Sequence, residues 1–136
     1  MLDPATVASL IATLYTTGSK GLKVVRRMRS KRQGVLDLLS ESEQMRKYLE
    51  QLKGLSDALK RDAKFRNILS NFNDARCKSA VDAVQKFVEG LSARRTITEW
   101  YKSAVWASSQ GRVESLLKDM RNRKNNLTDV LTMVIG

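Results

Sequence analysis

The sequence predicts an all-α fold, an antiparallel bundle of four long helices with a short accessory helix. The chain has one proline, aromatic residues make up only 6% of it, and Leu, Lys, Arg, Ser and Ala are abundant. The β-branched and aromatic runs, bounded by turn residues, that indicate strands are missing. Apolar residues instead recur three or four positions apart, which is the period of amphipathic helices that pack together at small crossing angles.

The first two predicted helices cover roughly residues 4–30 and 35–60, separated by a polar, basic break. Asp3 can cap the first helix, and Pro4 suits its first position because the missing N–H costs nothing there. The apolar row of the first helix is Val7, Ile11, Leu14, Gly18, Gly21, Val25 and Met28. The row of the second is Val35, Leu38, Met45, Leu49, Leu52 and Leu59.

A connector over residues 61–73, with a short helical turn at 65–69, leads into a third helix at roughly 74–92. Asp74 can cap this helix. Its apolar row is Cys77, Val81, Val84, Val88 and Leu91, with Phe87 beside it.

The accessory helix is expected at roughly residues 96–107, where it would carry Trp100, Tyr101 and Trp106. These aromatic residues fit either an interfacial belt or, as we prefer, the packed end of a bundle. Residues 108–111 then predict a break before a final helix at roughly 112–134. The row of this last helix is Val113, Leu117, Met120, Leu127, Leu131 and Val134.

Length and charge limit the class of protein. A chain of 136 residues fits a single domain, 1–136, that buries a core without disulfides or metal. The net charge of +11 attracts polyanions, either phosphodiester backbones or anionic lipid headgroups. The lone Cys77 excludes an intramolecular disulfide and suits a reducing, cytoplasmic compartment. Asp3 precedes the first apolar segment and basic residues follow it, which reverses the charge order of a secretory leader.

No set of residues predicts catalysis. The chain has no histidine, the commonest general base and metal ligand. Cys77 lies on an apolar row, where a buried structural thiol is the ordinary interpretation. The segment 18–21 reads Gly-Ser-Lys-Gly but lacks the full spacing of a phosphate-binding loop. We therefore expect a protein that binds, without enzymatic activity, cofactor or metal.

The amino-terminal third carries the clearest functional signal. Residues 4–19 contain no charge, and residues 20–32 contain only basic charges. The basic residues are Lys20, Lys23, Arg26, Arg27, Arg29, Lys31 and Arg32. An apolar segment beside a polybasic one provides the two signals that anchor a protein to anionic membranes. The alternative is a bundle helix with a solvated basic end.

Length limits what the first helix can do in a bilayer. As a helix, residues 4–19 would span about 24 Å, which is short of the roughly 30 Å hydrocarbon core. Entry would therefore follow release from the bundle and would need partners for the polar face. Gly18 and Gly21 on the core face indicate either close helix packing or a hinge that frees residues 1–17.

Further basic clusters at 60–66 and 112–124 also fit nucleic acid. No helix-turn-helix, zinc-finger or RNA-binding signature accompanies them. Nucleic acid is therefore the disfavoured partner, although the charge leaves it open.

The order Asp3, Pro4, Val7, Ala8, Ser9, Leu10 and Ile11 resembles the start of the fungal HeLo-like domains at the amino terminus of NOD-like receptors and related STAND proteins. The leucine-rich segment 35–59 and the late tryptophan segment before residues 112–117 are similar to those domains as well. Arg123, Lys124, Leu127 and Leu131 continue the likeness, which covers nearly the whole chain.

The resemblance implies a cell-death domain of innate immunity, similar in kind to the helical bundle of the mixed-lineage kinase domain-like pseudokinase. Such a domain would form a homo-oligomer when an upstream sensor or receptor domain is engaged, and would move from the cytoplasm to the plasma membrane. Val7, Leu10, Ile11 and Leu14 would then be the inserting residues, and the seven basic residues above would bind anionic membrane lipids. The chain would be a domain excised from a receptor or a short stand-alone form. The alternatives are a homotypic assembly module and a nucleic-acid-binding bundle.

Overall fold

The computed structural model describes residues 4–27, 33–59, 61–70, 72, 74–92 and 104–135. Every element within these ranges is a helix, so the predicted all-α class is confirmed for them. The elements are α1 (Pro4–Arg27), α2 (Gln33–Leu59), α3 (Ala63–Leu69), α4 (Asp74–Ser92) and α6 (Ala104–Ile135). The predicted cap Asp3 and the row residue Met28 lie outside the described residues.

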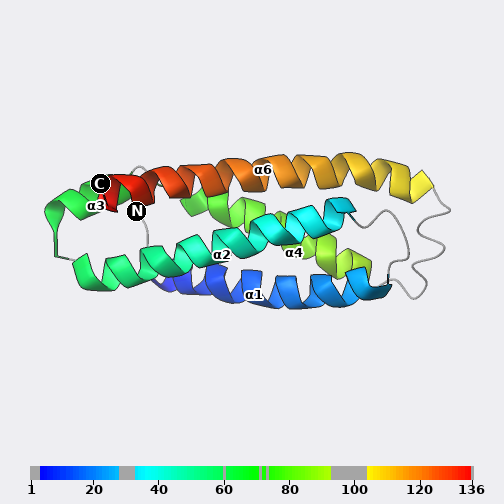
Figure 1. The fold of residues 1–136 in the computed structure, drawn as a ribbon, viewed down its shortest axis with the longest axis horizontal. Coiled ribbons are helices and arrows are strands. Elements are labelled where there is room, and N and C mark those ends of the chain that lie inside the picture. The colour runs from blue at the N-terminus through cyan, green and yellow to red at the C-terminus, as the bar shows by residue number, and fades with distance from the viewer. Residues whose placement is uncertain are drawn as a thin grey trace.

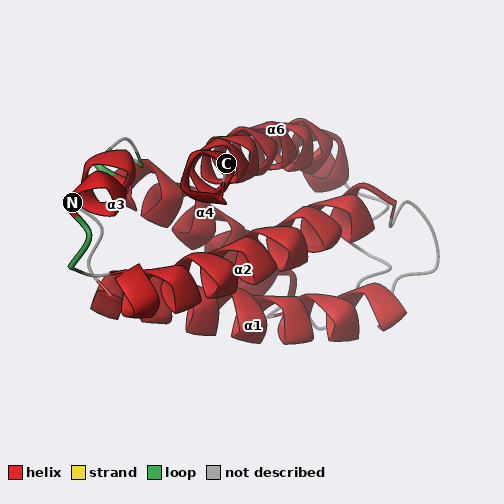
Figure 2. Ribbon diagram, turned by 60° about the vertical axis from the view of Figure 1, so that its left-hand side comes forward, coloured by secondary structure: helices red, strands yellow, loops and turns green. Residues whose placement is uncertain are grey.

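Each long helix packs against two others. α2 lies between α1 and α6, and α4 contacts the same two helices from the other side. Figure 1 shows that α1 and α2 run in opposite directions along the molecule, whereas α2 and α6 run in the same direction. In Figure 2 the short α3 lies beside α6, with which it makes contact. The apolar faces of the long helices therefore point toward a shared interior.

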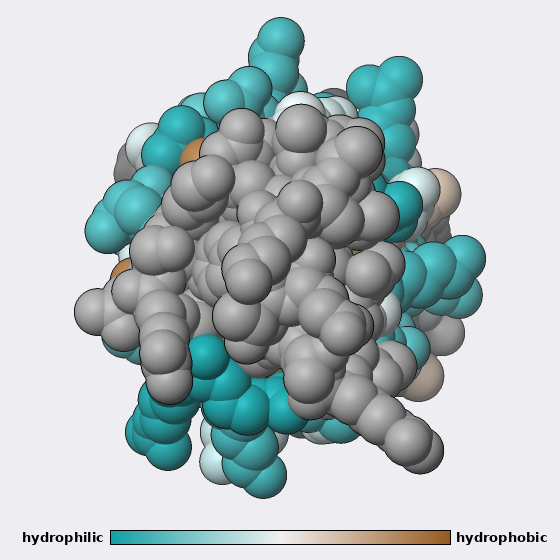
Figure 3. Space-filling model, turned by 90° about the vertical axis from the view of Figure 1, so that its right-hand side faces the viewer, coloured by the Kyte–Doolittle hydropathy of each residue, from teal (hydrophilic) through white to brown (hydrophobic). Residues whose placement is uncertain are grey.

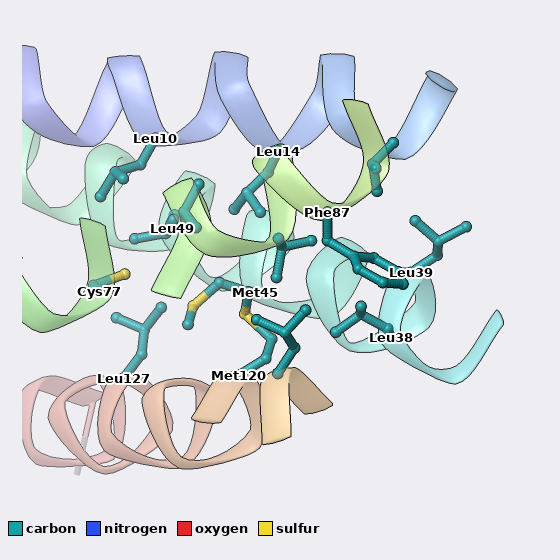
Figure 4. Packing of buried hydrophobic residues seen from close by; sticks show 14 of the residues in the cluster. Leu10, Leu14, Leu38, Leu39, Met45, Leu49, Cys77, Phe87, Met120 and Leu127 are labelled. Atoms are coloured by element: carbon teal, nitrogen blue, oxygen red, sulfur yellow. The ribbon is translucent and has the colours of Figure 1, made fainter. Parts of the chain in front are cut away.

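The interior is filled mainly by leucine, valine and methionine. Leu38, Met45, Leu49, Met120 and Leu127 are completely buried, and Figure 4 shows them meeting from α2 and α6. Cys77 of α4 is buried among them, as its place on the apolar row predicted. Burial of one such side chain contributes about 1.5–3 kcal/mol, so this cluster is the main source of stability.

Helix α3 begins at a side-chain cap formed by the residue just before it. The Asp62 carboxylate accepts hydrogen bonds from the backbone N–H groups of Lys64 (2.9 Å) and Phe65 (3.3 Å), which caps the first turn. Phe65 and Leu69 then anchor the helix in the core. The predicted helical turn at 65–69 is confirmed, and the cap that starts it is Asp62.

The prediction of a helix ending at residue 107 and a break at 108–111 is wrong. α6 begins at Ala104 and continues through this segment to Ile135. Serine and glycine weaken a helix by up to about 1 kcal/mol each, but only proline removes a backbone hydrogen bond. Tertiary packing just beyond the segment holds the helix, because Val113 is buried and its Cγ1 lies 3.2 Å from the position that a Cβ at Gly34 would take. Residues 96–103, with Trp100 and Tyr101, and the side chain of Trp106 lie outside the described residues.

A half-buried ion cluster joins α2 to α6. The Glu41 carboxylate lies 2.6 Å from Lys124 Nζ and 3.3 Å from Arg121 Nε. Lys124 also donates a hydrogen bond of 2.9 Å to the side-chain oxygen of Gln44. Because the Glu41 and Lys124 side chains are only 13% and 17% exposed, this cluster favours one register between the two helices.

Candidate functional site

The predicted inserting residues are part of the core. Val7, Leu10 and Leu14 are 2%, 3% and 2% exposed, and Ile11 is half-buried against the same cluster. Figure 4 shows Leu10 and Leu14 pointing from α1 toward Leu49 and Met45. In the folded state these side chains therefore stabilise the protein and are not available to a membrane.

The same face of α1 buries a polar group. Thr17 is 3% exposed, and its hydroxyl has no hydrogen-bond partner among the described residues. A buried hydroxyl without a partner costs about 1–3 kcal/mol, which weakens the packing of α1 in the turn that follows Leu14. Within the described ranges, no helix combines the length and the apolarity needed to cross a bilayer.

The carboxyl-terminal part of α1 presents four exposed cations, Lys20, Lys23, Arg26 and Arg27, which we call the basic end. α1 contains no acidic residue, and none of the four side chains forms an ion pair or hydrogen bond with a described residue. At about 100° per residue they fill one third of the helix circumference. Figure 3 views the molecule from this end. Hydrophilic side chains, drawn in teal, project around the edge of the view. Arg29, Lys31 and Arg32 lie outside the described residues.

The cations of α2 and α6 contrast with the basic end. Arg46 pairs with both Glu43 and Glu50, and Arg123 lies 3.7 Å from Asp119. Arg121 and Lys124 share Glu41. These helices therefore neutralise part of their own charge, whereas α1 leaves all of its charge available to an external anion.

A groove of about 500 Å³ runs between α1 and α2 on the outer surface. Its walls are Tyr15, Gly18, Ser19 and Leu22 from α1 and Leu36, Leu39, Ser40, Glu43 and Arg46 from α2. Tyr15 and Leu22 are 64% and 48% exposed, and together with Met133 they are the large hydrophobic residues most exposed in the described part of the chain. Two of these three side chains therefore line one groove.

Charged side chains fix the end of the groove at which Tyr15 and Arg46 lie. The Arg46 guanidinium lies 5.8 Å from the centre of the Tyr15 ring, a cation–π distance. The hydrogen bond from Arg46 lowers the pKa of the Glu43 carboxyl, and the two glutamates raise the pKa of Arg46. Arg46 and Glu43 therefore stay charged at neutral pH and keep the Tyr15 ring in place.

The two glycines of α1 differ in their surroundings. A Cβ at Gly21 would overlap Cδ2 of Leu39 and lie 2.9 Å from its Cδ1, so no side chain fits between α1 and Leu39 there. Gly18 has no atom within 4 Å of such a Cβ and faces the groove. The interpretation of close packing is thus correct at Gly21. The placement of Gly18 on the core face is wrong, because the register of α1 against α2 turns it toward solvent.

No protein-family model, curated protein or solved structure matches this chain. The HeLo-like resemblance therefore rests on the motifs at residues 3–11, 35–59 and 112–131.

The described site consists of exposed cations and a largely apolar groove. Among the described residues, no group of three His, Cys, Asp or Glu side chains could hold a metal ion. The sequence located the basic end correctly, because its residues lie within two consecutive turns. The groove was missed, since it depends on how Tyr15 and Leu22 lie against residues 14 or more positions away in α2.

Proposed function

We propose that this chain binds anionic membrane surfaces through the basic end of α1 and acts as a membrane-permeabilising, oligomerising cell-death domain of the HeLo-like kind. The observation that supports this function is a helix without acidic residues whose four exposed cations have no partner in the described part of the chain. A basic residue near an anionic leaflet contributes about 1 kcal/mol to binding. Lys20, Lys23, Arg26 and Arg27 would together contribute about 4 kcal/mol, and salt would weaken this contribution.

In this proposal the four long helices, α1, α2, α4 and α6, form one bundle in which helices that follow one another in the chain run in opposite directions, with a short helix beside them. The protein has no enzymatic activity. It stays in the cytoplasm until an upstream sensor or receptor domain is engaged, and then moves to the plasma membrane, where copies associate.

Recruitment and permeabilisation are separate steps in this proposal. Val7, Leu10 and Leu14 are buried, so the folded protein can bind a membrane surface without inserting. Removing these side chains from the core costs about 1.5–3 kcal/mol each. Membrane contact and association with other copies must offset that cost before α1 enters the bilayer.

Vesicle sedimentation tests the recruitment step. We compare the wild type with a variant in which Lys20, Lys23, Arg26 and Arg27 are all glutamine, using phosphatidylserine-containing and neutral vesicles at low and high salt. A matched control changes four exposed cations that also lack ion pairs, Lys53, Lys78, Lys86 and Lys118, so that both variants lose the same charge.

We expect the α1 variant to lose most of its binding to anionic vesicles, and the control to lose much less. Equal losses in the two variants would mean that only net charge matters, which contradicts a site on α1. Tighter binding to a nucleic-acid duplex than to anionic vesicles at the same salt would favour the nucleic-acid alternative instead. Self-association that neutralising the basic end does not change, without vesicle binding, would favour the homotypic assembly module.

A further inference from the structure

We propose that the groove between α1 and α2 binds an amphipathic α-helix of another protein, one whose apolar face is bordered by acidic residues. The groove itself contains none of the four cations of the basic end, although Lys23 and Arg26 border it. Binding there requires the folded protein, with α1 packed against α2. The proposal rests on the shape, apolar lining and charge of the groove.

The shape and lining fit a helix. Tyr15, Ser19 and Leu22 are four and three positions apart, so they form a straight wall two turns long on α1. Leu36 and Leu39 form the opposite wall, and Gly18 leaves the floor open because nothing lies within 4 Å of its missing side chain. A groove between two helices, open to solvent along one side, receives the apolar ridge of a third helix with anchors at i, i+3 or i+4, and i+7.

The rim is already ordered. Arg46 lies over the Tyr15 ring at 5.8 Å and is itself held by Glu43 and Glu50. A partner therefore does not have to immobilise these side chains on binding, which lowers the entropic cost of association. Tyrosine and arginine are also the residues that most often dominate binding energy at protein interfaces.

Charge indicates the kind of partner. Arg26 follows Leu22 by four positions and Lys23 follows Ser19 by four, so both continue the α1 wall beyond the apolar part of the groove. Neither cation has a partner in the described part of the chain, whereas Arg46 at the other end is neutralised by two glutamates. The occupant therefore needs carboxylates at the Arg26 end, where they meet unpaired cations.

The same charges argue against this chain as its own partner. A second copy carries a net charge of +11, and Glu41, Glu43, Glu50 and Asp119 of α2 and α6 are already in ion pairs. The segments 28–32 and 93–103 are both rich in basic residues. An amphipathic, acidic helix from a different protein matches both the apolar lining of the groove and the unpaired cations beside it.

A designed peptide tests this inference in the absence of lipid. The probe is a fluorescent helix of about 16 residues with leucines at the i, i+4 and i+7 positions and flanking glutamates. The comparison probe has lysines in place of those glutamates. The protein variants are Gly18→Leu, which fills the groove where space is open, and the matched Gly111→Leu on α6, where nothing lies within 4 Å either.

We expect the glutamate probe to shift the amide NMR signals of Tyr15, Gly18, Leu22 and Leu36, and the lysine probe to have no such effect. Gly18→Leu should weaken binding by about tenfold or more, and Gly111→Leu should not change it. If circular dichroism shows that Gly18→Leu does not fold, Leu22→Glu, at a half-exposed position, replaces it.

Equal binding of both probes, or equal binding to Gly18→Leu and wild type, would overturn the proposal. Groove signals that respond to phosphatidylserine vesicles and not to the glutamate probe would also overturn it, because the occupant would then be a lipid. Because Gly18→Leu leaves all four cations of the basic end in place, vesicle recruitment is tested separately from peptide binding.

Discussion

The Leu39 side chain of α2 lies directly against Gly21 of α1, on the two helices that carry both candidate surfaces. A Cβ at Gly21 would overlap Cδ2 of Leu39 and lie 2.9 Å from its Cδ1. One turn earlier, Gly18 faces open space. The same residue type therefore has opposite roles within four positions, which leads to a pair of stability predictions.

Gly21→Ala should destabilise the protein. The added methyl group would displace the buried Leu39 side chain, and overpacking of this kind costs about 1–3 kcal/mol. The higher helix propensity of alanine offsets about 1 kcal/mol of that loss. Chemical denaturation should show a lower free energy of unfolding than the wild type; a gain in stability would mean that Leu39 moves freely into the groove.

Gly18→Ala should stabilise the protein, in contrast to Gly21→Ala. The new methyl group meets no atom within 4 Å, so only the lower conformational entropy of the unfolded chain remains. We expect a gain of about 0.5–1 kcal/mol in the free energy of unfolding. A loss in the same denaturation experiment would show that the glycine is needed for a conformation other than the regular helix of the folded state.

Glu41→Gln should weaken the contact between α2 and α6. The substitution leaves Lys124 half-buried without its ion pair, which costs about 1–3 kcal/mol. Combining it with Lys124→Met should recover part of the loss, because the unpaired cation is then removed. A double-mutant cycle by thermal unfolding measures the coupling energy, and additive effects would rule out the pairing.

Glu43→Gln should destabilise the protein only above acidic pH. Arg46 holds the pKa of Glu43 below its ordinary value of 4.5, so the carboxylate stabilises the fold above that pH. The contribution disappears as the pH falls through the lowered pKa of the folded state. Because Glu43 is largely exposed, the difference at neutral pH should be small, about a few tenths of a kcal/mol. A difference that stays constant down to acidic pH would contradict the pairing with Arg46.

Val84→Ala should increase vesicle leakage without changing vesicle binding. Val84 is buried on α4, which packs against α1, and its truncation costs about 1–3 kcal/mol of core stability. The basic end is untouched, so recruitment is unchanged while release of α1 becomes easier. Dye release and sedimentation measured on the same vesicles check both halves. Unchanged leakage, despite a confirmed loss of stability, would argue against release of α1 as the permeabilising step.

Many of the buried apolar residues could be predicted from the helical spacing of apolar residues in the sequence. Leu38, Met45 and Leu49 are all buried, as their spacing predicted, because one face of α2 points inward. The period alone was insufficient, because Leu10 and Val24 of α1 and Leu39 of α2 are also buried although they lie off the predicted rows. α1 contacts both α2 and α4, so its buried face is wider than a single row.

The register between helices was not predictable from local pattern. On α6, Leu116 is buried and Leu117 only half-buried, because a small rotation of the helix decides between neighbouring positions. Glu41 and Lys124 belong to helices far apart in sequence, and no local rule brings them together. The groove has the same origin, whereas the basic end was predictable because its charges are consecutive along one helix.

The burial of Val7, Leu10 and Leu14 has a consequence for how this protein can vary. If α1 permeabilises membranes, the three side chains that hold the resting fold together are the ones that must leave it. Substitutions that strengthen the core would then slow permeabilisation, and substitutions that loosen it would let α1 leave the bundle without a trigger. A more heat-resistant variant would therefore permeabilise membranes more slowly.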